Sequence, residues 1–360
     1  MADPARRGLV EAGRFVAEHR DRLAARITDD ELERTPALQA RYGERGRRKC
    51  AQDNLYHLDY FASALKQDTP TLFQEYLKWA KVLLEELHIP AEDLAASLRS
   101  MRAVLEEELP PPMRASLAVL DDAIEALSDT PDGPASCIDP RRPFAALARR
   151  YLDLLLARER ARACRAILDA VDAGTPIRDI YLEVFQPSLY EIGRLWQTNR
   201  ISVAEEHYCT AATQLVIAQL YPRIFDAPRI GRRMIATCVA GELHELGVRM
   251  VADFFEMEGW DACYLGASTP ADALVSAVVE WKPHLVAVSA TLSTHIEEVA
   301  HVIARLRAEP GAAEVPILVG GNPFNTTPEL WRRVGADGHA HTAREAIDVA
   351  RVVKRGTTRA

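Results

Sequence analysis

The chain has 360 residues, an apolar content of 48%, a formal net charge of −8 and six cysteines. These values are typical of a globular protein of two or three domains, and the negative charge argues against direct binding to nucleic acid. No apolar run is long enough to span a membrane, the charged N-terminus does not resemble a signal peptide, and the cysteines lack paired metal spacing. We therefore expect a cytoplasmic protein with reduced thiols.

Residues 1–127 are expected to form a helical domain. Their apolar residues recur at intervals of three and four, which is the period of an amphipathic helix. Prolines separate the periodic segments, and the expected helices span 6–27, 37–67, 70–87, 91–108 and 113–127. Residues 128–142 begin with a stretch rich in Ser, Pro, Gly and Asp, and they are expected to form a linker.

Residues 143–228 are expected to form a four-helix bundle with short connections. One long helix is expected over 144–173, and another over 177–197. Ser202 precedes Glu205 by three residues, which is the spacing of a capping box, so a further helix is expected to begin there.

Residues 229–360 are expected to form an α/β domain with a flavodoxin-like Rossmann fold. Five apolar runs alternate with segments of helical period, as strands and crossover helices do in a parallel sheet. The expected strands lie near 233–239, 261–265, 285–290, 316–319 and 337–341. In such a sheet, ligands bind beyond the carboxyl ends of the strands. The fold class is thus expected to be α and α/β, in several domains.

His244 lies in the loop that follows the first expected strand, between Gly241 and Gly247. A neutral imidazole is a good ligand for a transition metal such as cobalt. Glu242 stands two residues earlier, and its carboxylate is suited to hold the second ring nitrogen of the histidine. The loop alone is also compatible with a flavodoxin-like domain whose glycines serve only tight turns.

Two further elements follow this loop at fixed intervals. Forty-one residues separate Gly247 from Ser-Ala-Thr, and 28 more precede Gly-Gly. The pattern resembles the cobalamin-binding motif of methionine synthase and the base-off B12 enzymes, with Glu in place of Asp, as in light-sensing B12 domains of the CarH type, and Thr in place of Leu. The resemblance implies His244 as the lower axial cobalt ligand. It also implies cobalamin contacts from Glu242, Leu246, Gly247, Ser289, Thr291, Gly320, Gly321 and Asn322.

The expected bundle carries a second pattern, in which Trp196 is followed after nine residues by Glu206 and His207. This pattern resembles the cap of the CarH-type photoreceptors, in which the tryptophan covers the upper adenosyl group and the Glu-His pair binds it. The alternatives are a core aromatic residue and a solvated helix face. In one branch of that family a histidine follows the tryptophan and ligates cobalt after illumination. Here the residue is Gln197, so His207 or a solvent ligand would take that role.

The arrangement of a helical domain, a cap bundle and a Rossmann domain resembles that of the photocobilins, which bind adenosylcobalamin and biliverdin. A bilin needs aromatic walls, a His or Asp near its pyrrole nitrogens, and cations for its propionates. The candidates in the first domain are His57, Tyr56, Tyr60, Asp59, Arg45 and Arg48, with Cys50 as a potential covalent attachment point. The alternative is a plain helical domain whose aromatic residues form its core.

These resemblances together predict a light sensor that binds adenosylcobalamin in the base-off, His-on form, with a biliverdin as a second chromophore. The sequence shows no catalytic triad, phosphate loop or carboxylate pair suited to hydrolysis, so no enzymatic activity is expected. We expect a homodimer whose assembly responds to light and whose downstream partner is unknown. The alternatives are a corrinoid methyl carrier and a B12-dependent interaction module that does not respond to light.

Overall fold

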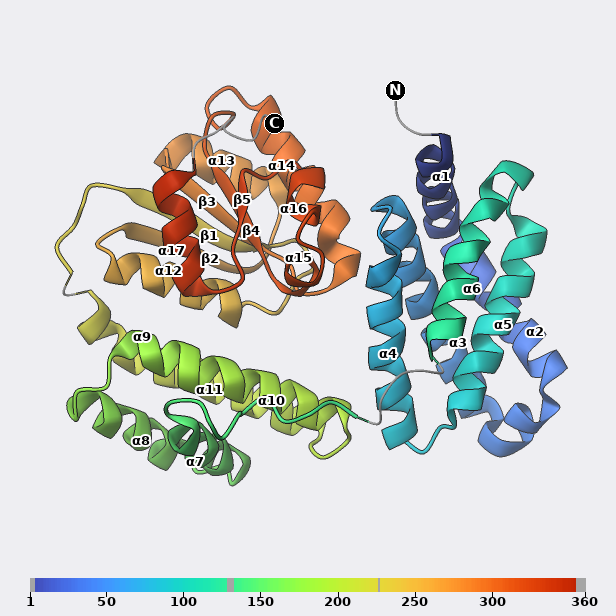
Figure 1. Ribbon diagram of the computed structural model, residues 1–360, viewed down its shortest axis with the longest axis horizontal. Coiled ribbons are helices and arrows are strands. Elements are labelled where there is room, and N and C mark those ends of the chain that lie inside the picture. Colours follow the sequence, from blue (N-terminus) through green and yellow to red (C-terminus); the bar gives the residue numbers. More distant parts are fainter. Residues whose placement is uncertain (1–3, 128–132, 226, 354–360) are drawn as a thin grey trace. The chain divides into compact units, whose positions relative to one another are not determined.

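The computed structural model describes residues 4–127, 133–225 and 227–353 of the chain. They form two compact units, Met1–Gly133 and Pro134–Ala360, which are described separately (Figure 1). The linker expected over 128–142 contains no helix or strand from residue 133 onward. Residues 128–132 lie outside the described part. Among the described residues, no helix has both the length and the apolar character needed to cross a membrane.

The first unit is helical, as the spacing of its apolar residues predicts. Its core is formed by side chains with little or no exposure, among them Leu23, Phe61 and Met101. The single helix expected over 6–27 is wrong, because the helix is interrupted at His19, whose backbone leaves helical geometry. The helices are α1 Pro4–Glu18, α2 Arg20–Arg34, α3 Pro36–Lys66, α4 Pro70–Glu86, α5 Ala91–Glu108 and α6 Leu117–Ala126, with a 3-10 helix over Pro111–Ser116.

The second unit begins with the expected helical bundle. The single helix expected over 144–173 is wrong, since Arg158 adopts a φ of 61°, which ends one helix and allows the next to turn back. The helices are α7 Ala145–Leu156, α8 Arg160–Asp172, α9 Ile177–Ile180, a π-helical turn Tyr181–Phe185, α10 Gln186–Gln197 and α11 Val203–Ile224. The capping box of Ser202 and Glu205 is confirmed at the start of α11.

The rest of the second unit is a five-stranded parallel sheet with helices on both faces, and the flavodoxin-like fold is confirmed. The strands are β1 Arg233–Val239, β2 Asp261–Thr269, β3 Leu285–Ser289, β4 Ile317–Gly320 and β5 Gly338–His339, in the order β2-β1-β3-β4-β5. The helices are α12 Leu246–Met257, α13 Ala271–Trp281, α14 Ile296–Ala308, α15 Asn322–Thr326, α16 Leu330–Arg333 and α17 Ala343–Val352. The sheet order changes direction between β1 and β3, where open α/β sheets bind their ligands.

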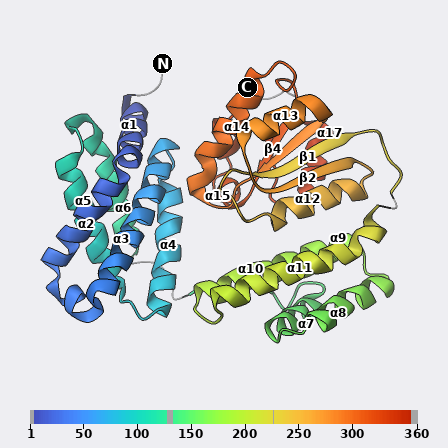
Figure 2. The same cartoon turned by 180° about the vertical axis from the view of Figure 1, so that it is seen from behind.

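The bundle and the sheet domain share one hydrophobic core. Tyr181 of the bundle donates its hydroxyl proton to Asp253 of α12 at 2.8 Å, in a buried position. Arg178 pairs with Glu258 at 2.7 Å beside this contact. Both ribbon views place α11 along α12 (Figures 1 and 2). The packing therefore fixes α11 against the domain that carries the His244 loop.

Candidate functional site

The three motif elements meet at the carboxyl edge of the sheet. Cys238, near the end of β1, pairs in register with Ser289 of β3, and Ser289 pairs with Gly320 of β4. The loops that follow these three strands therefore leave the sheet side by side. This arrangement brings the His244 loop, the Ser289–Thr291 element and the Gly-Gly pair to one edge, as the parallel sheet predicts.

Glu242 is the buried centre of this edge. Its side chain is fully buried, and its Oε1 accepts a hydrogen bond from His244 Nδ1 at 2.5 Å and another from the backbone N–H of His244 at 2.9 Å. A carboxylate in contact with one ring nitrogen leaves the other nitrogen, Nε2, with the lone pair that a metal requires. The expected pairing of Glu242 with the His244 ring is therefore present in the structure.

The second oxygen of Glu242 is also fully engaged. Glu242 Oε2 accepts from the backbone N–H groups of Thr291 at 2.6 Å and Leu292 at 3.1 Å, and from His295 Nδ1 at 3.0 Å. Burial alone raises the pKa of Glu242, but hydrogen bonds from the side chains of His244 and His295 and from the backbone amides of His244 and Thr291 outweigh it and hold the pKa far below its ordinary value. Glu242 is thus a charged acceptor at any physiological pH.

His295 is absent from the residues predicted for the site. It lies four residues after Thr291, in the loop that follows β3, and no feature of the motif distinguishes it from a surface histidine. Its place on the same sheet edge as His244 is the one signal in the sequence that could have indicated it. The structure adds it to the site through its contact with Glu242.

The His244 side chain is 58% exposed, so it can reach a ligand above the sheet edge. Its pKa is raised, first by its hydrogen bond to Glu242 and more weakly by the negative charge of Glu206 on α11. The Glu206 carboxylate on α11 therefore acts electrostatically on the imidazole of the loop. This effect links a residue of the bundle motif to a residue of the loop motif.

The small residues of the motif keep the sheet edge open. Gly321 has a φ of 106°, and a Cβ there would lie 2.0 Å from the carbonyl oxygen of Ala290, so no other residue fits. A Cβ on Gly247 would meet no atom within 4 Å, which leaves room beside the start of α12. Of the remaining predicted contacts, Leu246 and Ser289 are buried and Asn322 is exposed at the start of α15. Gly321 therefore permits the close approach of the loops after β3 and β4, whereas Gly247 leaves space at the start of α12.

The bundle presents its predicted residues on two helices. Trp196 lies half-buried near the end of α10, followed by the buried Gln197. Glu206 and His207 lie in the first turns of α11, where a hydrogen bond joins His207 Nδ1 to Glu206 Oε2, and Glu206 Oε1 accepts a hydrogen bond from Thr210 at 2.9 Å. The His207 side chain is 75% exposed. Glu206 and His207 therefore lie on the side of α11 from which the charge of Glu206 acts on His244.

A second contact between the bundle and the loop was not predicted. Gln214 of α11 donates to Glu245 Oε1 at 2.7 Å, and Tyr264 of β2 donates to Glu245 Oε2 at 2.7 Å. Glu245 follows His244 directly in the chain. The loop that carries His244 is thus tied to α11 on one side and to the sheet on the other.

Comparison with known proteins identifies the domains that carry this site. Residues 232–348 match the B12 binding domain family, and residues 147–221 match a second family of the same description. The chain carries two B12 binding domains. A corrinoid or cobalamin is therefore the cofactor of this site, in agreement with the motif spacing and with the imidazole and carboxylate that the structure brings together.

The relatives of these domains include two regulators of Myxococcus xanthus. The chain is 37% identical over 123 residues to the HTH-type transcriptional repressor CarA, and 32% identical over 158 residues to the HTH-type transcriptional repressor CarH. These matches cover 34% and 43% of this chain, and 41% and 51% of the two repressors. The chain thus matches about half the length of these relatives or less.

Corrinoid proteins are similar over a larger share of their own length. The dimethylamine corrinoid protein 1 of Methanosarcina mazei is 26% identical over 164 residues, which is 45% of this chain and 73% of that protein. The structure of the Methanosarcina barkeri monomethylamine corrinoid protein has the same fold, with a TM-score of 0.52, 21% identity, and coverage of 58% of this chain and 98% of that one.

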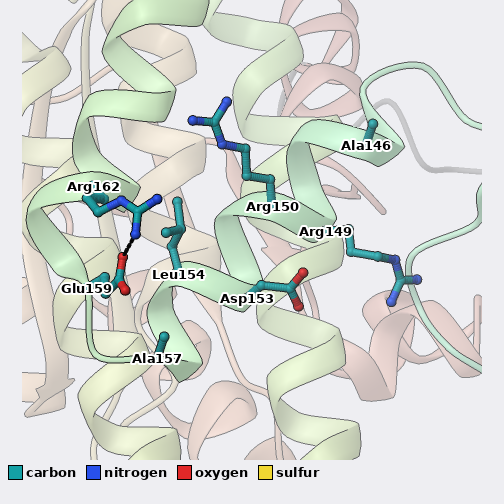
Figure 3. A pocket seen from close by; sticks show the side chains of 8 residues that line it. All are labelled: Ala146, Arg149, Arg150, Asp153, Leu154, Ala157, Glu159 and Arg162. Carbon is teal, nitrogen blue, oxygen red and sulfur yellow. Dashed lines mark hydrogen bonds and ion pairs between the residues drawn. The ribbon is translucent and has the colours of Figure 1, made fainter.

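The B12-binding chain also has a groove that the cofactor motifs do not touch. It has a volume of about 580 Å³ and lies on α7 and α8, where Arg149, Arg150 and Arg162 stand around Asp153 and Glu159 (Figure 3). Arg162 pairs with Glu159, so part of the positive charge is neutralised within the groove. The groove shares no residue with the predicted cobalamin contacts.

The residues proposed for a bilin lie in the first unit, outside the two B12 binding domains. His57 is buried, with its Nδ1 2.8 Å from the Tyr76 hydroxyl, and burial lowers its pKa to about 4. The Tyr60 ring stacks on Tyr76 with 3.8 Å between ring centroids. Tyr76 of α4 thus contacts both His57 and Tyr60.

The other bilin candidates have different surroundings. Asp59 accepts a hydrogen bond from Arg20 at 2.8 Å, and Tyr56 is 49% exposed. Arg45 and Arg48 are exposed on α3. Burial raises the pKa of Cys50 to about 11, so its thiol stays protonated, which disfavours covalent attachment of a chromophore.

Proposed function

We propose that this protein is a light sensor that binds adenosylcobalamin through His244 and changes its quaternary structure when the adenosyl group is lost. The observation that carries the proposal is the hydrogen bond from Gln214 of α11 to Glu245, which holds the helix of Glu206 and His207 beside the loop of His244. The negative charge of Glu206 also acts on His244. Both observations support a common site for the cobalt-binding motif and for the Trp196 and Glu206-His207 pattern, which resembles the cap of CarH-type photoreceptors. No catalytic role is proposed for any residue of the site.

Each residue has a defined part in this proposal. Glu242 would hold the Nδ1–H tautomer of His244, so that Nε2 could bind cobalt. The aromatic face of Trp196 would shield the adenosyl group, and Glu206 would accept hydrogen bonds from its ribose or adenine. When bound, adenosylcobalamin supplies a cobalt–carbon bond that visible light breaks.

Loss of the adenosyl group removes a set of contacts that exist in the dark state alone. Because of those contacts, the cofactor binds with different free energies to two arrangements of α10 and α11 on the sheet domain. A homodimer built across these helices would respond to that difference. The link from Gln214 to Glu245 is a direct route between α11 and the loop of the ligand.

The test is an absorption spectrum of the protein loaded with adenosylcobalamin in the dark, repeated after green light, with size-exclusion chromatography of both samples. We expect a shifted corrin band and a changed elution volume. His244→Ala should give a spectrum without histidine ligation, or lose the cofactor, because the variant lacks the imidazole that is proposed to bind cobalt. An unchanged spectrum of this variant would refute the assignment of His244.

We also propose that the first unit binds a biliverdin as a second chromophore. The stack of Tyr60 on Tyr76 beside the buried His57 offers aromatic surface next to an uncharged imidazole. His57→Ala should weaken biliverdin binding at least tenfold, measured by titration of the far-red absorption band. His88→Ala, an exposed histidine of the same unit, is the control. If the two variants bind biliverdin with equal affinity, the assignment of this site to a bilin is wrong.

The corrinoid relatives support a second candidate, a methyl carrier that passes a methyl group between partner proteins. The match with the dimethylamine corrinoid protein extends over 73% of that protein. A methyl carrier has no need of the Trp196 and Glu206-His207 pattern, and it should prefer methylcobalamin. A preference for methylcobalamin, with a spectrum indifferent to green light, would favour it over the light sensor. A cofactor bleached by light without any change of oligomer would favour a B12-dependent interaction module.

A further inference from the structure

His295 joins the loop after β3 to the loop that carries His244. It ends the short 3-10 turn Ser293–His295, and its backbone N–H donates to the carbonyl of Leu292 at 3.0 Å. Its side chain is 21% exposed, with Nδ1 3.0 Å from Glu242 Oε2. A Cβ on Gly241 would lie 3.4 Å from His295 Nε2, so the ring also lies against the first residue of the His244 loop.

Glu242 divides its two oxygens between two tasks. Oε1 receives both hydrogen bonds from His244, whereas Oε2 receives those from Thr291, Leu292 and His295. The orientation of Oε1, and with it that of the His244 ring, depends on how firmly Oε2 is held. Two of the three donors to Oε2 are backbone amides whose positions the fold sets, so His295 is the side chain among them that can vary.

We propose that His295 is a positioning residue, which fixes the Glu242 carboxylate and thereby the tautomer and orientation of the His244 imidazole. The inference rests on the proposed role of His244 as the cobalt ligand. Its physical basis is that a carboxylate held on both oxygens has one orientation in which Oε1 meets His244 Nδ1. With fewer donors on Oε2, the carboxylate can rotate, and the ring loses its fixed partner.

The test compares His295→Ala with His295→Asn, because the Asn amide nitrogen can stand where His295 Nδ1 stands and donate to Glu242. His301→Ala, an exposed histidine on α14, is the matched control. In the cobalamin-free protein, long-range proton–nitrogen NMR reports which nitrogen of His244 carries the proton. In the loaded protein, absorption titration gives the dissociation constant and the fraction of cobalamin ligated by histidine.

We expect His295→Ala to lose the single Nδ1–H tautomer of His244 and to bind cobalamin about tenfold more weakly, with a smaller histidine-ligated fraction. His295→Asn should restore both properties, and His301→Ala should match the wild type. A wild-type tautomer and dissociation constant in His295→Ala would overturn the inference. If the wild type itself does not bind cobalamin, the proposed function fails, while the NMR of the cobalamin-free variants still decides whether His295 positions His244.

Discussion

Two buried glutamates in this protein meet opposite electrostatic surroundings. Glu242 receives hydrogen bonds on both oxygens and remains charged. Glu31 of α2 is also buried, but it has fewer donors, Asn54 among them at 3.3 Å. Burial outweighs these bonds and raises the pKa of Glu31 to about 7. The same side chain is therefore an ionised anchor in the cobalamin site and a protonatable group in the first unit.

Glu31→Gln is expected to remove part of the pH dependence of the first unit. The folded state holds the Glu31 proton more tightly than the unfolded state, since its pKa rises from 4.5 to about 7. Its contribution to stability is full below pH 4.5 and is lost as the pH rises through 7, and a shift of this size corresponds to about 3 kcal/mol. The variant should therefore gain protection relative to wild type at pH 8 and not at pH 4.5.

Hydrogen exchange of the α2 and α5 amides in the full chain, with both proteins measured at each pH, checks this expectation. Glu33→Gln changes an exposed glutamate of the same helix and should leave the amide protection unchanged. Equal protection of Glu31→Gln and wild type at pH 8 would contradict it.

The elements that follow a strict period could be predicted from the sequence, and the breaks between them could not. Strands such as β1 and β3 were predicted because their apolar runs are buried on both faces. The capping box was predicted from Ser202 and Glu205, which are three residues apart and together cap the start of α11. The break at Arg158 was missed because the left-handed conformation that ends a helix is usually signalled by glycine, and an arginine gives no such signal.

The same distinction holds for the site. His244 and Glu242 were predicted to be partners because they are two residues apart and their chemistry is complementary. His295 meets Glu242 across 53 residues of chain, and Gln214 meets Glu245 across 31. Contacts of this length depend on how loops and helices pack, which a local pattern does not encode.

Ser202→Ala should loosen the first turn of α11, which carries Glu206 and His207. The Ser202 hydroxyl accepts the backbone N–H of Glu205, and the Glu205 side chain accepts the backbone N–H of Ser202. Loss of an N-cap hydroxyl costs about 1 kcal/mol. We expect faster hydrogen exchange in this turn and a lower affinity for adenosylcobalamin relative to methylcobalamin, because the turn is proposed to contact the adenosyl group alone.

Thr342→Ala provides the control for this prediction. Thr342 caps α17 by accepting the backbone N–H of Glu345 at 3.1 Å, so its removal should cost a similar free energy at a helix that carries none of the proposed adenosyl contacts. The affinity for adenosylcobalamin relative to methylcobalamin is compared between Ser202→Ala and Thr342→Ala. If this ratio falls equally in both variants, α11 has no special part in adenosyl recognition.

At the scale of the whole molecule, the second unit combines a B12 binding domain with a helix, α11, that packs against it. The bundle and the sheet domain share a continuous core, so α11 cannot move without changing contacts on α12. The buried bond of Tyr181 with Asp253 and the exposed pair of Arg178 with Glu258 resist such movement near the end of α12. The bond of Gln214 with Glu245 is half-buried and joins α11 to the residue next to His244. We propose that a change at His244 reaches α11 through this contact.

Gln214→Ala should therefore separate cofactor binding from the response to light. Glu245 keeps its hydrogen bond from Tyr264, so the loop retains its position on the sheet and His244 still binds cobalamin. The dark spectrum and its shift after green light should match those of the wild type, whereas the change in elution volume should fall by more than half. Gln219→Ala removes an exposed glutamine from the same helix and should respond as the wild type does. If Gln214→Ala changes its oligomeric state fully, the signal leaves the site by a route other than the bond of Gln214 with Glu245.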